Sequence, residues 1–397
     1  MKREFMKRLS SHCCVEKNEK IYFPALNFNA LYCMELDGSY LQFLGSIPEE
    51  NLYGINLYGA IYEKNNILYL APMNGERIAT YNIVTKEMKT ISIDTKKYGI
   101  KDMKSKFFRI LSKDEYIYFI PCRYRAIIKL NIVTGEITYI DGWYKAFFSD
   151  VPVGEMFVKR GAFIYKDKLL LATCFNNFVI EIDLNSYKPR CITVGNAKSG
   201  YMDAFFDGKY MWLLEKFDTK LWRYDFSTEQ SRYYNHMPSD LEVKGWPFIC
   251  ILDCNDKILA VSYHTNKSVI FNKTSGLSEC IDLEASGDIG LWNAKHYFAQ
   301  KISKNEVLMS NIPDHTFALL DMNTMKTRKF VLRDEKYEKR LFESYFLVQD
   351  KIVKEMDETN LEQFINYVKD NNLNEKYKDV TRFGSLIHWQ ISNELES

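Results

Sequence analysis

The sequence has little of what marks membrane, secreted or nucleic-acid-binding proteins. No apolar run approaches the roughly 18 residues of a membrane span, and the basic N-terminal stretch MKREFMKRLSSHCC has no apolar segment, so we expect no secretory signal. The nine cysteines include no C-x-x-C pair and are odd in number, which argues against a disulfide framework. Lys and Arg total 53 against 52 for Asp and Glu, a balance that does not favour polyanionic partners. We therefore predict a soluble, cytoplasmic protein that binds neither membrane nor nucleic acid.

Sequence motifs of known catalytic and cofactor sites are also missing. There is no G-x-S-x-G, H-E-x-x-H, P-loop or Rossmann phrase. The six histidines are scattered, with no chelating spacing between any two of them, so we predict no metal site and no cofactor. The sequence selects no particular reaction, and whether the protein is an enzyme stays open.

What the sequence does have is aromatic residues and an internal repeat. Tyr and Phe number 27 and 26, and strands favour such residues. Seven times, at spacings of 42 to 52 residues, a polar residue ends an apolar segment and opens a tight turn. These positions are Glu35, Asn82, Asn131, Asp183, Asp225, Asn272 and Asp321. An Asn or Asp there can accept a hydrogen bond from the backbone two residues on, and Gly or a small polar residue accepts the positive φ that follows.

The clearest copy of the repeat is Tyr116–Trp143, YIYFIPCRYRAIIKLNIVTGEITYIDGW. It reads as three strands, and another strand precedes it across a polar turn. Four short antiparallel strands repeated seven times predict an all-β fold, a seven-bladed β-propeller. The expected blades cover residues 9–47, 56–93, 105–141, 157–194, 200–234, 246–283 and 294–332.

The pattern changes after residue 333. Apolar residues then recur every three or four positions, and Thr359 with Glu362 forms a capping box, which together indicate helices. We predict a propeller over residues 1–333 and an α-helical C-terminal appendage, 334–397, packed on it and available to a protein partner. Two ways of closing the ring stay open: residues 1–8 add a strand to the last blade, or each blade is complete in itself.

Two resemblances follow from these phrases. The end of each unit, as in IIKLNIVTGE, resembles the repeats of YVTN- and PQQ-type propellers over all seven predicted blades. The resemblance implies the same fold but no single function, because propellers include enzymes, receptors and scaffolds. The phrases KIYFP and YIYFIP, with the helical tail, are also similar to propeller proteins of clostridial cell-surface polysaccharide gene neighbourhoods.

The first strand of each blade is expected to line the central tunnel. Side chains alternate across a strand, so we count back by even numbers from the polar turn that ends each first strand. The odd set is almost wholly apolar or small, as packing between blades requires. The polar members of the even set are Arg109, Arg160, Asp203, His296 and Gln300. Arginines match a carboxylate, phosphate or sulfate, and Asp203 with His296 is the candidate acid–base pair. The alternative is a solvated channel braced by an Arg–Asp pair.

Further candidates lie on one face of the ring. The connections from second to third strand and from blade to blade share this face, here called the loop face, while the short turns share the tight-turn face. Because the loops are the more varied, we predict that the loop face carries function. Its candidate ligand-binding residues are Arg123, Arg125 and His264, with Tyr201, Trp246 and Trp292 available to stack on a sugar ring. The alternative for these aromatic residues is that they pack as wedges between neighbouring blades.

Three hypotheses remain at this point. The first is a ligand-binding propeller that recognises a glycan or small anionic ligand at the tunnel mouth. The second is an enzyme of lyase, isomerase or hydrolase type that uses the same mouth. The third is a scaffold for protein–protein interaction.

Overall fold

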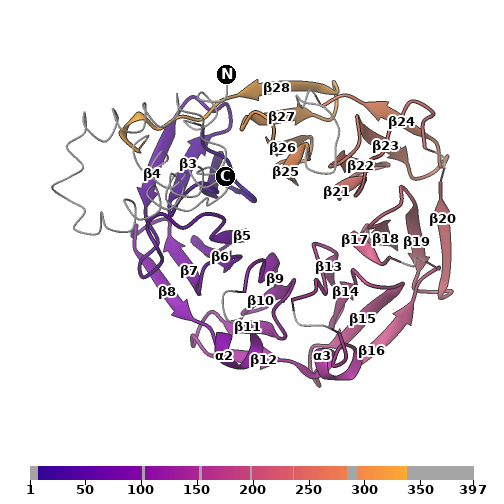
Figure 1. Ribbon diagram of the computed structural model, residues 1–397, viewed down its shortest axis with the longest axis horizontal. Helices are drawn as coiled ribbons and strands as arrows, with labels where there is room; N and C mark the ends of the chain where they lie inside the picture. Colours follow the sequence, from indigo (N-terminus) through magenta and orange to yellow (C-terminus); the bar gives the residue numbers. More distant parts are fainter. Residues whose placement is uncertain are drawn as a thin grey trace, which may run out of the picture. The chain divides into compact units, whose positions relative to one another are not determined.

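A computed structural model describes residues 8–100, 103–151, 154–196, 199–235, 237–283 and 294–337. These residues form seven four-stranded antiparallel sheets, the blades of a ring (Figure 1). Within each sheet the strands follow chain order, and the first strands, such as β9 (Phe107–Lys113) and β21 (Phe248–Cys254), lie innermost. The prediction of an all-β, seven-bladed propeller is confirmed.

The strands have the following bounds, blade by blade. Blades one to three contain β1 Val15–Lys17, β2 Lys20–Pro24, β3 Leu31–Glu35, β4 Leu41–Gly45; β5 Tyr58–Lys64, β6 Ile67–Pro72, β7 Arg77–Asn82, β8 Met88–Ser92; and β9, β10 Tyr116–Pro121, β11 Ile127–Asn131, β12 Ile137–Ile140. Blades four and five contain β13 Ala162–Tyr165, β14 Lys168–Ala172, β15 Phe178–Asp183, β16 Pro189–Thr193; and β17 Tyr201–Phe206, β18 Tyr210–Glu215, β19 Leu221–Asp225, β20 Gln230–Tyr234. Blades six and seven contain β21, β22 Lys257–Ser262, β23 Ser268–Asn272, β24 Ser278–Ile281; and β25 His296–Lys301, β26 Glu306–Asn311, β27 Phe317–Asp321, β28 Lys326–Phe330.

The turns that set the repeat behave as their sequences predict. Asn131 Oδ1, for example, accepts hydrogen bonds from the backbone N–H groups of Val133 at 2.8 Å and Thr134 at 3.1 Å. The positive φ that follows falls on Gly135 here, but on Lys86 and Tyr187 in other blades. The expectation of Gly or a small polar residue at this position was therefore too narrow, because the side-chain cap fixes the turn whichever residue follows.

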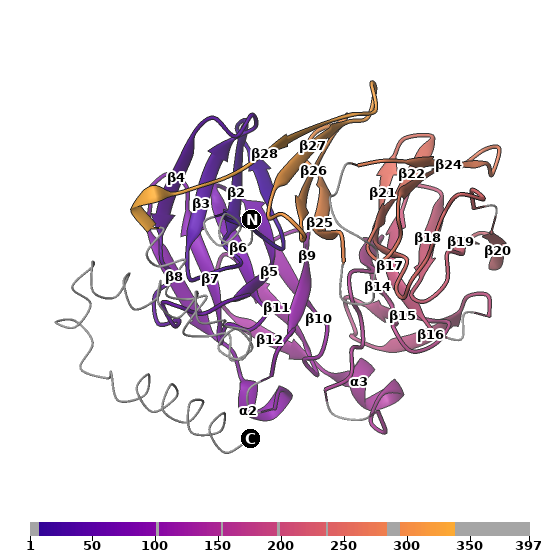
Figure 2. The same cartoon turned by 45° about the horizontal axis from the view of Figure 1, so that its top comes forward.

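Short helices lie between blades on the loop face. They are α2 (Thr95–Tyr98), which precedes β9, and α3 (Gly142–Phe147), which precedes β13. Figure 2 shows both helices on one side of the ring. No helix of the described residues is long and apolar enough to span a bilayer.

Among the described residues the first and last blades share no strand, and each blade is complete in itself, one of the two alternatives that the sequence left open. The last blade consists of β25 to β28 alone, and the first of β1 to β4. The backbone N–H of Leu9 donates to the carbonyl of Leu332 at 2.9 Å, and the Phe23 and Phe317 rings, from the first and last blades, lie 5.4 Å apart. The closure therefore rests on side-chain packing and single hydrogen bonds rather than on a β-ladder.

The predicted C-terminal appendage lies almost entirely outside the described residues. A single 3₁₀ turn, η1 (Glu335–Tyr337), is the last described element. Its helices and its docking role stay predictions.

Candidate functional site: the central channel

Five of the first strands contain a one-residue bulge that the sequence did not reveal. The register with the second strand shifts at Gly59, Phe108, Met202, Ile249 and Tyr297. An inserted residue reverses the alternation of side chains upstream of it. The count back from the tight turn therefore holds as far as the bulge and fails beyond it.

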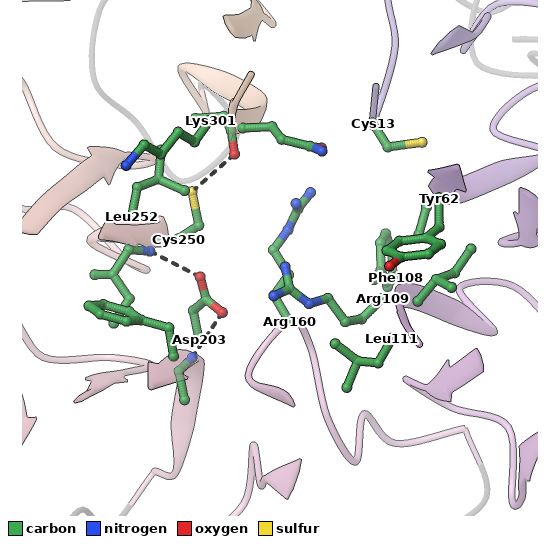
Figure 3. A pocket seen from close by; sticks show the side chains of 18 of the residues that line it. Cys13, Tyr62, Phe108, Arg109, Leu111, Arg160, Asp203, Cys250, Leu252 and Lys301 are labelled. Carbon is green, nitrogen blue, oxygen red and sulfur yellow. Dashed lines mark hydrogen bonds between the residues drawn. The ribbon is translucent and has the colours of Figure 1, made fainter. Parts of the chain in front are cut away.

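The larger cavity of the channel lies between the bulges and the tight-turn face. It has a volume of about 480 Å³, and its walls come from the second halves of first strands, such as Ile110, Leu111, Leu252 and Asp253. Four of the five residues predicted to face the tunnel line this cavity. They are Arg109, Arg160, Asp203 and Gln300. Figure 3 shows both arginine side chains extending into its middle, with Asp203 on the facing wall.

Asp203 is held by backbone donors from two blades. Its Oδ1 accepts from the N–H of Ala204 at 2.8 Å, and its Oδ2 accepts from the N–H of Ile251 at 3.0 Å. The side chain is buried, and this burial raises the pKa of the carboxyl, while the charges of Arg109 and Arg160 oppose the rise. Both oxygens are thus engaged, and Asp203 joins the fifth blade to the sixth.

Within the part of the chain that the structure describes, Arg109 and Arg160 have no carboxylate partner. No guanidinium nitrogen of either residue lies within 4.0 Å of a carboxylate oxygen of a described residue. The Arg109 side chain is exposed to the channel although protein surrounds it. Burial lowers the pKa of Arg109; Asp203 raises it and the charge of Arg160 lowers it further. Arg160 Nη2 donates to the carbonyl of Tyr297 at 3.2 Å, and its buried Nε has no partner among the described residues.

Two lysines near the same cavity have polar partners of different kinds. Lys301 Nζ donates to the carbonyl of Asp253 at 3.1 Å. The Asp253 carboxylate pairs with Lys273 at 2.7 Å, and Lys273 also lies 3.5 Å from Asp207. These contacts tie neighbouring blades at the tight-turn face. Among the described residues, Arg109, Arg160 and Lys301 therefore all face the cavity without an ion-pair partner, and the two arginines are the ones whose side chains extend into its middle.

A second, smaller cavity of about 200 Å³ lies at the loop-face end of the channel. Phe108 and Arg160 line both cavities and so form the boundary between them. The other walls of the smaller cavity are largely aromatic or basic. They include His12, Lys159, Trp246, Tyr263 and Tyr297.

His296 does not enter the channel, and this corrects the prediction of an Asp203–His296 couple. His296 lies just before the bulge at Tyr297, where it is the strand-register partner of Asn311. Its side chain is fully buried and lines neither cavity. Burial lowers its pKa to about 4. The bulge places Tyr297 in the channel wall instead, so the acid–base pair is not assembled.

Of the aromatic residues predicted to stack on a sugar, one lines a cavity and another is buried. Trp246 lines the smaller cavity. Tyr201 is fully buried and its hydroxyl donates to the carbonyl of Val194, so it offers no stacking face. Trp143, in the connection between the third and fourth blades, is also fully buried, and its indole N–H donates to the Ile140 carbonyl at 3.0 Å.

The loop arginines and His264 stand outside both cavities. The Arg125 guanidinium lies 5.5 Å from the centre of the Tyr144 ring, a cation–π contact, and Arg123 has a buried Nε without a partner among the described residues. His264 is buried and supports Trp246 rather than facing a ligand. Trp292 lies outside the described residues.

Sequence reasoning missed His12 and Lys159. The His12 ring lies 5.1 Å from that of Tyr297 and its Nε2 is 3.0 Å from Asn56 Oδ1. Burial, helped by the charges of Lys159 and Arg160, lowers its pKa to about 3. His12 precedes the first strand, so no strand count could reach it. Lys159 could have been found, because it is next to Arg160 in sequence, and Arg160 was predicted to face the channel.

The other candidate chemistries find no support in side-chain placement. No group of three or more His, Cys, Asp or Glu among the described residues is placed to hold a metal ion. All nine cysteines are free, and Cys13 and Cys250 line the larger cavity with pKa values that burial raises to about 12. Such thiols are poor nucleophiles at neutral pH.

Fold and channel together define a seven-bladed β-propeller with a basic central cavity. No protein-family model matches the sequence, and no curated protein matches it. The resemblances to YVTN- and PQQ-type repeats and to clostridial propeller proteins thus find no support from a sequence family, and what is confirmed is the seven-bladed fold.

Comparison with solved structures finds propellers of diverse origin. A virginiamycin B lyase from Staphylococcus aureus is 12% identical, with 78% of this chain and 93% of that chain covered at a TM-score of 0.57. The computationally designed protein Ika8 is 12% identical, covering 81% and 87% at 0.54. A chain of the Mitotic Checkpoint Complex is 9% identical, covering 83% and 90% at 0.52. At these identities the likeness shows the fold alone.

Proposed function

We propose that this propeller binds a small anionic ligand in its larger channel cavity, between Arg109 and Arg160. The observation that carries the proposal is the pair of guanidinium groups that face one cavity without a carboxylate partner among the described residues. Two acidic residues line the cavity: Asp203 accepts a backbone N–H with each of its oxygens, and the Asp253 carboxylate pairs with Lys273.

Electrostatics supports an anion at this position. Two like charges in one enclosed site destabilise each other, and the charge of Arg160 indeed acts to lower the pKa of Arg109. An anion between them removes this repulsion and supplies acceptors for their N–H groups. A guanidinium fork fits a carboxylate or phosphate through two parallel hydrogen bonds. The cavity volume, about 480 Å³, falls within the range of roughly 300–1,000 Å³ that small-molecule sites have.

Binding is better supported than catalysis. Each Asp203 oxygen already accepts one backbone hydrogen bond, and the histidine predicted to act with it, His296, lines neither cavity, so no acid–base pair faces a substrate there. The likeness to a lyase concerns the fold of that protein and brings no catalytic group to this channel.

The test is calorimetric titration of the full chain with inorganic phosphate and with malonate at low ionic strength. We expect Arg109→Gln and Arg160→Gln each to weaken binding by about 10- to 100-fold, because a hydrogen bond to a charged group contributes roughly 1.5–3 kcal/mol. Arg232→Gln, which changes an exposed arginine on the outermost strand β20, should leave affinity unchanged. Equal loss in all three variants, or no anion binding by the unaltered protein, would contradict the proposal.

A further inference from the structure

A series of aromatic rings leads from the loop-face rim into the smaller cavity. Phe217, 54% exposed, lies with its ring centre 6.1 Å from that of Trp246. The Trp246 ring is in turn stacked on Tyr263, at 6.1 Å and an interplanar angle of 19°. Trp246 and Tyr263 line the cavity, so the series connects its interior to the rim.

The middle of this series is fixed by the backbone. The N–H of Trp246 donates to Nδ1 of the buried His264 at 3.1 Å, which requires a neutral imidazole, and burial lowers the pKa of His264 accordingly. The N–H of Tyr263 donates to the carbonyl of Pro247 at 2.9 Å. Rings held in this way offer a flat apolar surface at little cost in side-chain entropy.

The inner end of the smaller cavity is positively charged. The Lys159 ammonium lies 3.7 Å from the centre of the Phe108 ring, a cation–π contact. It forms no ion pair with a described residue. Arg160 stands beside it at the boundary with the larger cavity. The outer rings carry a cation too, because the Lys216 ammonium lies 5.0 Å from the centre of the Phe217 ring and 5.7 Å from that of Trp246. A ligand that enters from the loop face thus meets aromatic rings with one ammonium group beside them, and two further cations behind them.

From this order of groups we infer that the anionic ligand is an acidic sugar, a uronic acid at the end of a glycan. Its ring lies in the smaller cavity against Trp246 and Tyr263. Its carboxylate points inward past Lys159 to Arg160, the residue that also faces Arg109 in the larger cavity. The apolar C–H face of a pyranose fits a flat aromatic surface, and its hydroxyl groups meet the imidazole of His12 and the hydroxyl of Tyr297. This inference rests on the proposed function and assigns it a substrate class.

The size of the cavity limits the ligand. At about 200 Å³ it is smaller than the roughly 300–1,000 Å³ of sites for drug-sized ligands. It therefore takes one ring, and the next residue of a glycan would lie over the exposed Phe217 at the rim. The channel end and the rim together favour end-on entry of a chain.

The experiment compares three probes, glucuronate, glucose and inorganic phosphate, by calorimetry on the full chain. We expect glucuronate to bind at least tenfold more tightly than either of the others. Trp246→Leu should weaken glucuronate by about tenfold and leave phosphate unchanged, because only the sugar uses the ring. Arg160→Gln should weaken both. Tyr233→Leu, which removes another exposed aromatic ring outside the channel, is the matched control and should change neither.

The outcomes separate this inference from the proposed function. Glucuronate affinity that is insensitive to Trp246→Leu, with phosphate binding still lost in Arg109→Gln, overturns the acidic sugar and leaves the anion site standing. Glucose that binds as tightly as glucuronate also overturns it. If no anion binds, both proposals fail. The melting temperature of each variant shows whether it is folded. If Trp246→Leu does not fold, Trp246→Phe replaces it in the test, and we expect this variant to keep most of the affinity.

Discussion

Replacing Gly200 by alanine should destabilise the propeller by about 3 kcal/mol or more. Gly200 has a φ of +73°, which an L-residue rarely adopts. An added Cβ would lie 2.4 Å from the Cys174 carbonyl carbon and 2.5 Å from both the Phe175 nitrogen and the Thr173 oxygen. All three are backbone atoms of the loop after β14, which a hydrogen bond from the Tyr201 N–H to the Thr173 carbonyl, at 2.7 Å, holds against Gly200. Relief therefore requires the fourth and fifth blades to separate.

Gly135 provides the matched control for this substitution. Its φ is +76°, and nothing lies within 4 Å of the position of its missing Cβ. Gly135→Ala should therefore show the conformational cost alone, about 1–2 kcal/mol. Chemical denaturation measures both, as the shift of the midpoint at unchanged m-value. Equal losses in the two variants would mean that the close approach of the blades at Gly200 is not sterically limiting.

The second expected result is a loss of stability on mild acidification, on the order of 5 kcal/mol between pH 7 and pH 4.5. Burial lowers the pKa of His296 to about 4 and that of His12 to about 3. In the unfolded chain both titrate near 6.5. Each therefore stabilises the fold fully above pH 6.5, and this contribution is lost as the pH falls toward the folded-state values. Over the two pH units below 6.5 each group accounts for about 2.7 kcal/mol.

Neighbouring charges do not reverse this sign. Around His296 burial dominates; Asn311 and Asp314 raise its pKa, and Lys295 and Lys329 lower it. The pKa values of His264 and His315 are lowered by burial too, and they add to the loss. Asp203, Glu50 and Glu215 act in the opposite direction, because burial raises the pKa of each carboxyl. Carboxyls whose pKa is lowered, against the effect of burial, by hydrogen bonds and neighbouring cations, such as Glu181 and Asp207, act in the same direction as the histidines.

Urea denaturation at pH 7, 5.5 and 4.5 tests this expectation. His296→Gln should reduce the difference between pH 7 and 4.5 by about 2–3 kcal/mol, since a neutral amide takes up no proton. Arg232→Gln on the outer strand should leave the difference unchanged. A denaturation midpoint that stays constant from pH 7 to 4.5 would contradict the placement of the histidines.

The blades were predictable from sequence because their signals are local. The turn at Asn131 is fixed by contacts within four residues, and the same is true of Asn82 and Asp321. The alternation along each first strand is equally local between the tight turn and the bulge. For that reason Arg109 and Asp203, four residues before their turns, were placed in the channel by counting alone.

The bulges were not predictable from sequence, because no residue type requires them. Gly59, Phe108, Met202, Ile249 and Tyr297 have nothing in common chemically, yet each occupies the inserted position of its first strand. They lie where the first strands converge on the channel and must fit one another across it. The reversal they impose removed Tyr201 and His296 from the channel and brought in Met202 and Tyr297.

The sequence by itself determined that the chain folds into seven blades of four strands. It also placed Arg109 and Asp203 four residues, and Arg160 six residues, before the tight turns that follow their first strands. Only the tertiary structure decided that the ring closes, among the described residues, through Leu9 and Leu332 without a shared strand. It also decided that Arg109 and Arg160 share one cavity while Asp203 is engaged by backbone N–H groups. The physical reason is range: turns and alternation arise among near neighbours in sequence, whereas bulges, cavities and charge pairing depend on which blades meet across the axis.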